Sequence, residues 1–106
     1  MIKKYILILI GLIIFLFSLD SEEFSNHEKQ YTMDEVSKHN TREDMWTVIN
    51  GNVYKIPESW INEHPGGDQI LNAAGIDATD LFEGVRYHGS RAEERLETYK
   101  IGILKV

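Results

Sequence analysis

The stretch Trp60–Gly67 constrains this chain more than any other, because it holds a histidine in a stiff turn beside apolar residues. Pro65 fixes its own φ angle and biases His64 before it away from the helical region. Gly66 and Gly67 then allow the backbone to turn sharply and to approach a flat ligand closely. Imidazole is the commonest metal ligand in proteins, so His64 is a candidate ligand. Taken alone, the motif fits an exposed turn histidine equally well.

A second histidine decides between these two interpretations. His88 follows 24 residues further on (88 − 64), in another expected loop, with Phe82 and Val85 just before it. We therefore favour a ligand role for both histidines.

The chain also resembles a known family, the cytochrome b5-like haem-binding domain, over about seven-tenths of its length, from Tyr31 to Leu104. The resemblance implies that His64 and His88 ligate the iron of one non-covalently bound haem b from opposite faces. It further implies an α+β cytochrome b5-like haem-binding fold, in which a small mixed sheet carries two helix–loop–helix units that form the haem crevice. The motifs that carry it, in the family's order, are Tyr31-Thr32-Met33-Asp34-Glu35-Val36, Trp46-Thr47-Val48-Ile49, Asn52-Val53-Tyr54, His64-Pro65-Gly66-Gly67, Ala78-Thr79, Phe82-Glu83 and Ile101-Gly102.

Apolar residues near the two histidines are candidates for the haem-binding surface, because a porphyrin is itself apolar. Each of them fits an ordinary core position equally well. The chain has no cysteine, which excludes disulfides, thiolate ligands and covalent haem attachment. The candidate lining residues are Trp60, Ile61, Ile70, Leu71, Phe82 and Val85.

Length and charge limit the partners. A chain of 106 residues suffices for one domain. The net charge is −6, and from Tyr31 onward 8 Lys/Arg face 13 Asp/Glu, a net −5. This excess disfavours nucleic acid and favours a redox partner protein with a basic docking surface. The acidic residues expected around the exposed haem edge are Glu63, Asp68, Asp80 and Glu83.

The N-terminal segment differs from the rest, and we divide the chain accordingly. Lys3 and Lys4 precede an uncharged, mostly apolar run from Tyr5 to Leu19, short of the roughly 20 residues that span a bilayer. We expect residues 1–19 to be a signal peptide or signal anchor, 20–30 a polar tether that includes His27, and 31–106 the haem domain. The domain is then exported, on the extracytoplasmic side, either membrane-anchored or soluble after cleavage, because the lysines stay cytoplasmic.

Local patterns predict the elements of the domain. Thr32 and Glu35 form a capping box for a helix to about His39. Asn50-Gly51 between strand-like runs at 46–49 and 52–56 predicts a hairpin with a type I′ turn. Helices are expected at 57–62, from 68 to a stop at Gly75, and at 78–83 with Leu81 and Phe82 inward. A second capping box at 90–93 opens the last helix, and 101–106 is the final strand.

The loop before His88 departs from the family's pattern. Arg86-Tyr87 stands where one small residue is commoner, and Gly89 replaces a polar residue that often contacts a haem propionate. Ser90 or Arg91 could make that contact instead. Tyr87 is a rival axial ligand, since tyrosinate can hold haem iron.

These features favour an electron-transfer haem protein, a bis-histidine b-type cytochrome, over an enzyme. Two axial histidines leave no coordination position for oxygen or substrate. One alternative is a non-redox haem- or sterol-binding module of the membrane-associated b5-like type, which usually lacks the histidine pair. Another is a zinc site on His64 and His88, although zinc sites usually have three or four clustered ligands.

Overall fold

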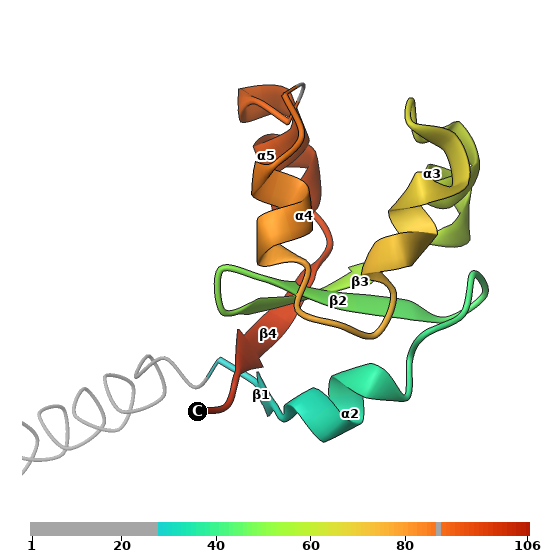
Figure 1. Cartoon of the computed structure of the whole chain (residues 1–106). Coiled ribbons are helices and arrows are strands. Elements are labelled where there is room, and N and C mark those ends of the chain that lie inside the picture. The colour runs from blue at the N-terminus through green and yellow to red at the C-terminus, as the bar shows by residue number, and fades with distance from the viewer. Residues whose placement is uncertain (1–27, 87) are drawn as a thin grey trace, which may run out of the picture.

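The computed structural model describes residues 28–86 and 88–106 (Figure 1). The predicted signal or anchor at 1–19, the tether residues 20–27 with His27, and Tyr87 lie outside the described residues. Within the described ranges, no helix has the length and apolar character that crossing a membrane requires.

A four-stranded mixed sheet forms the base of the domain. Its strands are β1 (Gln30–Tyr31), β2 (Met45–Ile49), β3 (Asn52–Ile56) and β4 (Lys100–Leu104), in the order β1-β4-β3-β2. The β1–β4 pair is parallel, whereas β4–β3 and β3–β2 are antiparallel. The predicted α+β class with a small mixed sheet is therefore confirmed.

The sheet begins before the predicted start of the domain at residue 31. Gln30, which we expected in the polar tether, pairs with Ile103, and the Lys29 carbonyl accepts a hydrogen bond from the Ile103 N–H at 2.9 Å. A two-residue edge strand is too short to carry a period-2 pattern, so the sequence did not reveal it.

The hairpin between β2 and β3 follows the prediction. Asn50 (φ 51°) and Gly51 (φ 76°) both adopt the left-handed region that a type I′ turn requires at its two central residues. This turn fixes the register, which pairs Met45 with Ile56 and Ile49 with Asn52.

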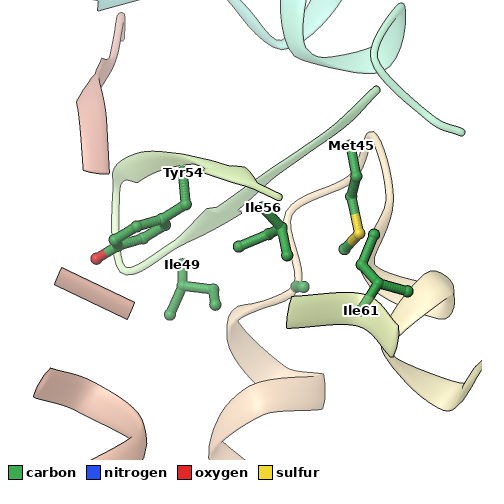
Figure 2. Close-up of a cluster of buried hydrophobic side chains, with 6 residues drawn as sticks. Met45, Ile49, Tyr54, Ile56 and Ile61 are labelled. Atoms are coloured by element: carbon green, nitrogen blue, oxygen red, sulfur yellow. The ribbon is translucent and has the colours of Figure 1, made fainter. Parts of the chain in front are cut away.

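Alternate residues of the hairpin enter two hydrophobic clusters, one on each face of the sheet. On the face that carries most of the helices, Met45 of β2 and Ile61 of α3 (Glu58–Glu63) point toward one another (Figure 2). Burial raises the pKa of the Tyr54 phenol in this cluster above its ordinary value of 10.0. This first cluster contains Met45, Ile49, Tyr54, Ile56, Ile61 and Ala78, and the second contains Val36, Val48 and Val53.

One helix, α2 (Met33–Ser37), covers the second cluster through the fully buried Val36. Its capping box is formed as predicted: the Glu35 N–H donates to the Thr32 hydroxyl at 3.2 Å, and the Thr32 N–H donates to the Glu35 carboxylate at 3.3 Å.

Two pairs of helices stand on the opposite side of the sheet (Figure 1). We call α3 with η1 (Gly67–Ala73) the His64 arm, and α4 (Thr79–Glu83) with α5 (Ser90–Glu97) the His88 arm. Both arms pack partly buried residues against the first cluster, among them Leu71, Phe82 and Leu96.

The helix expected after Gly67 is present as a 3₁₀ helix, and the Ala74 N–H accordingly bonds to the Leu71 carbonyl three residues back. Two other local predictions about the arms were wrong. Ser90 lies inside α5, whose N-cap is Gly89, so the second capping box does not form. Leu81 is 51% exposed, because neighbours on a helix point about 100° apart and Phe82 takes the inward position.

The segment Gly75–Ala78 joins the two arms and is fastened to the outer edge of β2. The Gly75 N–H donates to the Trp46 carbonyl at 2.7 Å, the Val48 N–H to the Ile76 carbonyl at 3.0 Å, and the Ala78 N–H to the Val48 carbonyl at 2.7 Å. The end of η1 and the start of α4 are thereby tied to one strand.

Gly75→Ala is expected to destabilise the domain more than Gly51→Ala. Both glycines have positive φ (74° and 76°), so they share the conformational cost. A Cβ at Gly75 would lie 2.8 Å from the Asn40 Cβ, whereas one at Gly51 meets nothing within 4 Å. Gly75→Ala should therefore lower the free energy of unfolding by about 1–3 kcal/mol more than Gly51→Ala does, which is the usual cost of overpacking. Chemical denaturation measures both losses. Equal losses in the two variants would contradict the tight packing of Gly75–Ala78.

Candidate functional site

His64 follows directly after α3, at the point where the chain leaves the helix. Its backbone is extended (φ −58°, ψ 125°), the conformation expected before proline. The chain then reverses through Gly66 and Gly67, and the Gly67 N–H donates back to the His64 carbonyl at 2.8 Å. The loop between α3 and η1 is therefore a closed turn with the imidazole held on it.

The His64 imidazole is folded back over this turn. Its Nδ1 lies 3.2 Å from the Gly67 carbonyl oxygen. A Cβ on Gly66 would lie 2.9 Å from the His64 Cε1 and 3.3 Å from Nδ1, well inside the separation of about 3.5–4.0 Å at which carbon atoms pack. Glycine at this position is therefore a steric requirement of the ring orientation.

His88 lies in the loop between α4 and α5. The His88 N–H donates to the Val85 carbonyl at 3.2 Å, and its ring Nδ1 lies 2.8 Å from the Phe82 carbonyl oxygen. The ring stacks on the Phe82 ring, with centroids 4.3 Å apart and planes at 21°. A hydrogen bond and an aromatic contact thus fix this imidazole.

The two imidazoles face one another across the space between the arms, with ring centroids 6.4 Å apart and planes at 58°. Each Nδ1 is beside a backbone carbonyl, which can only accept a hydrogen bond, so the proton of each neutral ring belongs on Nδ1. Each Nε2 then keeps its lone pair. This is the usual arrangement of a metal-ligating histidine.

The spacing of the two rings fits one metal ion between them. Metal–imidazole nitrogen bonds are about 2.0 Å long, and the nitrogen lies about 1.1 Å from its ring centre, so trans imidazoles have centres about 6.2 Å apart. The observed 6.4 Å is close to this value. Among the described residues, no group of three or more His, Cys, Asp and Glu side chains could hold a metal ion, which argues against a tetrahedral zinc site. A flat ligand that supplies the remaining metal ligands itself suits this pair.

The six predicted lining residues differ in their surroundings. Trp60, Ile70, Leu71 and Phe82 are partly buried against the first cluster, and the Trp60 ring is edge-on to the His64 ring at 6.0 Å. Ile61 is 1% exposed inside that cluster, whereas Val85 is 43% exposed. Contact between these residues and a bound haem stays a prediction.

Two arginines that no sequence motif singled out make contacts around the site. The Arg95 guanidinium of α5 lies 4.3 Å from the centre of the Trp60 ring of α3, which connects the two arms. Arg42, in the loop before β2, binds Asn62 and Asp68 on the two sides of the His64 loop. No periodic pattern relates residues so far apart in the chain, so the sequence held no signal for these contacts.

His39 lies apart from the histidine pair. Its ring stacks on the Trp46 ring at 3.7 Å, and its Nδ1 lies 2.7 Å from the Asp44 carboxylate. It follows the C-cap of α2, Lys38, as predicted for a residue at a helix C-terminus. The rival ligand Tyr87 is outside the described residues, and Ser90 and Arg91 are exposed at the start of α5.

Comparison with known proteins agrees with this geometry. The chain is 47% identical over 76 residues to cytochrome b5 of Candida tropicalis, covering 71% of this chain and 57% of that protein. It is 44% identical over 81 residues to cytochrome b5 of Drosophila melanogaster, covering 76% and 59%. The chain thus spans less than two-thirds of these relatives' length. Both of these relatives are named as cytochromes.

A solved structure shares the fold. Cytochrome b558 of Ectothiorhodospira vacuolata, a prokaryotic homologue of cytochrome b5, matches with a TM-score of 0.67 and 31% identity, covering 73% of this chain and 99% of that one. The model of the cytochrome b5-like haem/steroid-binding domain matches residues 32–105. The chain therefore belongs to the cytochrome b5-like haem-binding family.

Proposed function

We propose that this chain is an electron-transfer protein, a b-type cytochrome in which His64 and His88 hold one non-covalent haem b. The observation that carries the proposal is the histidine pair itself. Two rings from separate arms lie 6.4 Å apart, each with its Nδ1 beside a backbone carbonyl. Both Nε2 atoms are thus available for axial ligation.

A redox role would follow from the use of both histidines as ligands. His64 and His88 would hold the haem iron from two sides and leave no position open for oxygen or a substrate, and the bound haem would supply one-electron redox chemistry. The sterol-binding alternative does not require a pair of histidines at this spacing, so nothing in that role would explain the geometry. We therefore prefer the redox role.

The chain's own residues orient the ligands and exclude water. The carbonyls of Gly67 and Phe82 accept hydrogen bonds from the Nδ1–H groups, which fixes each tautomer and ring orientation. Phe82 stacks on one imidazole, and Trp60 meets the other edge-on. The apolar lining would lower the local dielectric constant, which together with the ligands sets the reduction potential.

Replacing either axial histidine should remove haem binding. His64→Ala and His88→Ala are each expected to abolish the low-spin absorption spectrum of the protein reconstituted with one equivalent of haem b. Acid–acetone extraction should remove all haem from the wild type, because the chain has no cysteine for covalent attachment.

His39→Ala is the matched control, because His39 bonds to Asp44 and not to the pair; it should keep the spectrum. If either of the two ligand variants retained a wild-type low-spin spectrum, another ligand such as Tyr87 would have to replace the assigned one.

For the redox partner, we propose a protein with a basic docking surface that meets acidic residues at the His64 and His88 loops. Glu63, Asp80 and Glu83 are exposed, and none takes part in an ion pair with another described residue. Asp68, the fourth member of the predicted rim, is paired with Arg42 at 2.5 Å, so its charge is partly compensated. The unpaired charge is therefore divided between the two arms.

Removing one charge from each arm should reduce the salt dependence of electron transfer. In Glu63→Gln/Glu83→Gln, the rate with a basic acceptor such as cytochrome c should be lower at low salt and should change less as salt rises. The reason is that the Debye length falls from about 10 Å at 0.1 M to about 3 Å at 1 M salt. Stopped-flow kinetics measure the rates.

The control is Asp34→Asn/Glu97→Gln, with the same change of charge. Asp34 is on α2, across the sheet, and Glu97 is at the end of α5 away from His88. Equal salt dependence in both double variants would assign these charges to solubility alone.

We also propose that residues 1–19 are a signal peptide or a membrane anchor that places the haem domain on the extracytoplasmic side. The support comes from the sequence: Lys3 and Lys4 precede the apolar run from Tyr5 to Leu19. A polar stretch from Asp20 then connects to the domain.

Protease added to spheroplasts of bacteria expressing the chain should digest the haem domain without lysis. A variant that lacks residues 1–19 should be protected, because it stays in the cytoplasm. Protection of the full chain until lysis would reverse the proposed topology. Immunoblotting of the domain, with a cytoplasmic protein as lysis control, measures the outcome.

A further inference from the structure

Arg42 connects two elements that the sequence separates widely. It lies in the loop 41–44, where Thr41 and Asp44 exchange backbone hydrogen bonds at 3.2 Å in both directions. Its Nη1 donates to the Asn62 side-chain oxygen of α3, and its Nη2 forms an ion pair with the Asp68 carboxylate of η1 at 2.5 Å. The Arg42 side chain is only 29% exposed, although it is charged.

Asn62 and Asp68 stand on either side of the His64 turn, one in the last turn of α3 and the other in the first turn of η1. The guanidinium is a rigid, planar fork, so two acceptors bound to it are held at a fixed separation. Between these two acceptors the chain makes the turn that carries the His64 imidazole. Arg42 therefore spans the base of this turn.

No other hydrogen bond among the described residues attaches this turn to the rest of the domain. The bonds of His64 and Gly67 are made to one another, within the turn. Those that leave residues 62–68 for a distant part of the chain both end on Arg42. The Arg42 contacts are thus the hydrogen bonds that link the two ends of the turn to the loop before β2.

We propose that Arg42 is a positioning residue for His64, which sets the orientation of this axial ligand and the retention of haem. The inference rests on the proposed function. Asp68 is 80% exposed, and an ion pair with a solvent-exposed partner contributes little to global stability, so we expect the effect mainly at the turn. In the absence of Arg42, the turn keeps its internal hydrogen bonds and the packing of Ile61 but loses its hydrogen bonds to the loop before β2.

Arg42→Gln should release haem faster while the fold stays intact. We expect transfer of haem to apomyoglobin to accelerate about 10-fold, the lower end of the usual effect of losing a residue that orients a metal ligand. The electron paramagnetic resonance signal of the low-spin ferric protein should shift or broaden, because the His64 ring adopts other orientations. The denaturant midpoint of the haem-free protein should stay near that of the wild type.

Three further variants make the test specific. Asn62→Ala removes an acceptor and should reproduce part of the effect from the opposite side of the contact. Arg42→Lys keeps the charge but lacks the planar fork, so it should restore wild-type haem retention only partly. Lys38→Gln, with the same change of charge at an exposed site on the C-cap of α2, should behave as the wild type.

The result that overturns the inference is a haem-transfer rate and resonance spectrum of Arg42→Gln equal to those of wild type and Lys38→Gln. That result leaves the proposed function intact. A wild-type protein without a low-spin bis-histidine spectrum would instead refute the proposed function, and the two failures are therefore distinguishable.

Discussion

The attachment of Gly75–Ala78 to the outer edge of β2 is the interaction on which the arrangement of the arms depends. Backbone hydrogen bonds link this segment to Trp46 and Val48, and the Thr47 hydroxyl adds a bond of 3.1 Å to the Ile76 carbonyl. The segment covers the strand edge, which would otherwise present unpaired backbone groups. Because η1 ends just before this segment and α4 begins just after it, these hydrogen bonds set where both arms leave the sheet (Figure 1).

From this common base, each arm holds its histidine by local contacts. On the His64 arm Gly66 makes room for the ring, and the Gly67 carbonyl holds it. On the His88 arm the carbonyl and the ring of Phe82 do so. The two sites share one principle: a main-chain carbonyl accepts a hydrogen bond from the Nδ1–H group, which leaves the Nε2 lone pair free. The fold then has only to bring the two rings to the separation that one ion requires.

Much of the fold could be predicted because its signals are local. The capping box of Thr32 and Glu35 formed as expected, and Asn50-Gly51 produced the type I′ hairpin. Predictions failed where two local choices compete for one element. Ser90 was expected to be the N-cap of α5, but the N-cap is Gly89 and the helix begins at Ser90. Leu81 was expected inward, although Phe82 occupies that side. A short helix offers too few turns for periodicity to settle its start or its face.

The sequence by itself determined the family, the two candidate ligands and the elements that bear them, because a turn motif and its histidine are contiguous in the chain. The tertiary structure alone decided the distance between the rings, the pairing of Asp68 with Arg42 and the contact of Arg95 with Trp60. These contacts join residues 24, 26 and 35 positions apart. Their geometry depends on how the sheet and the joining segment orient the arms, and a linear pattern carries no record of that orientation.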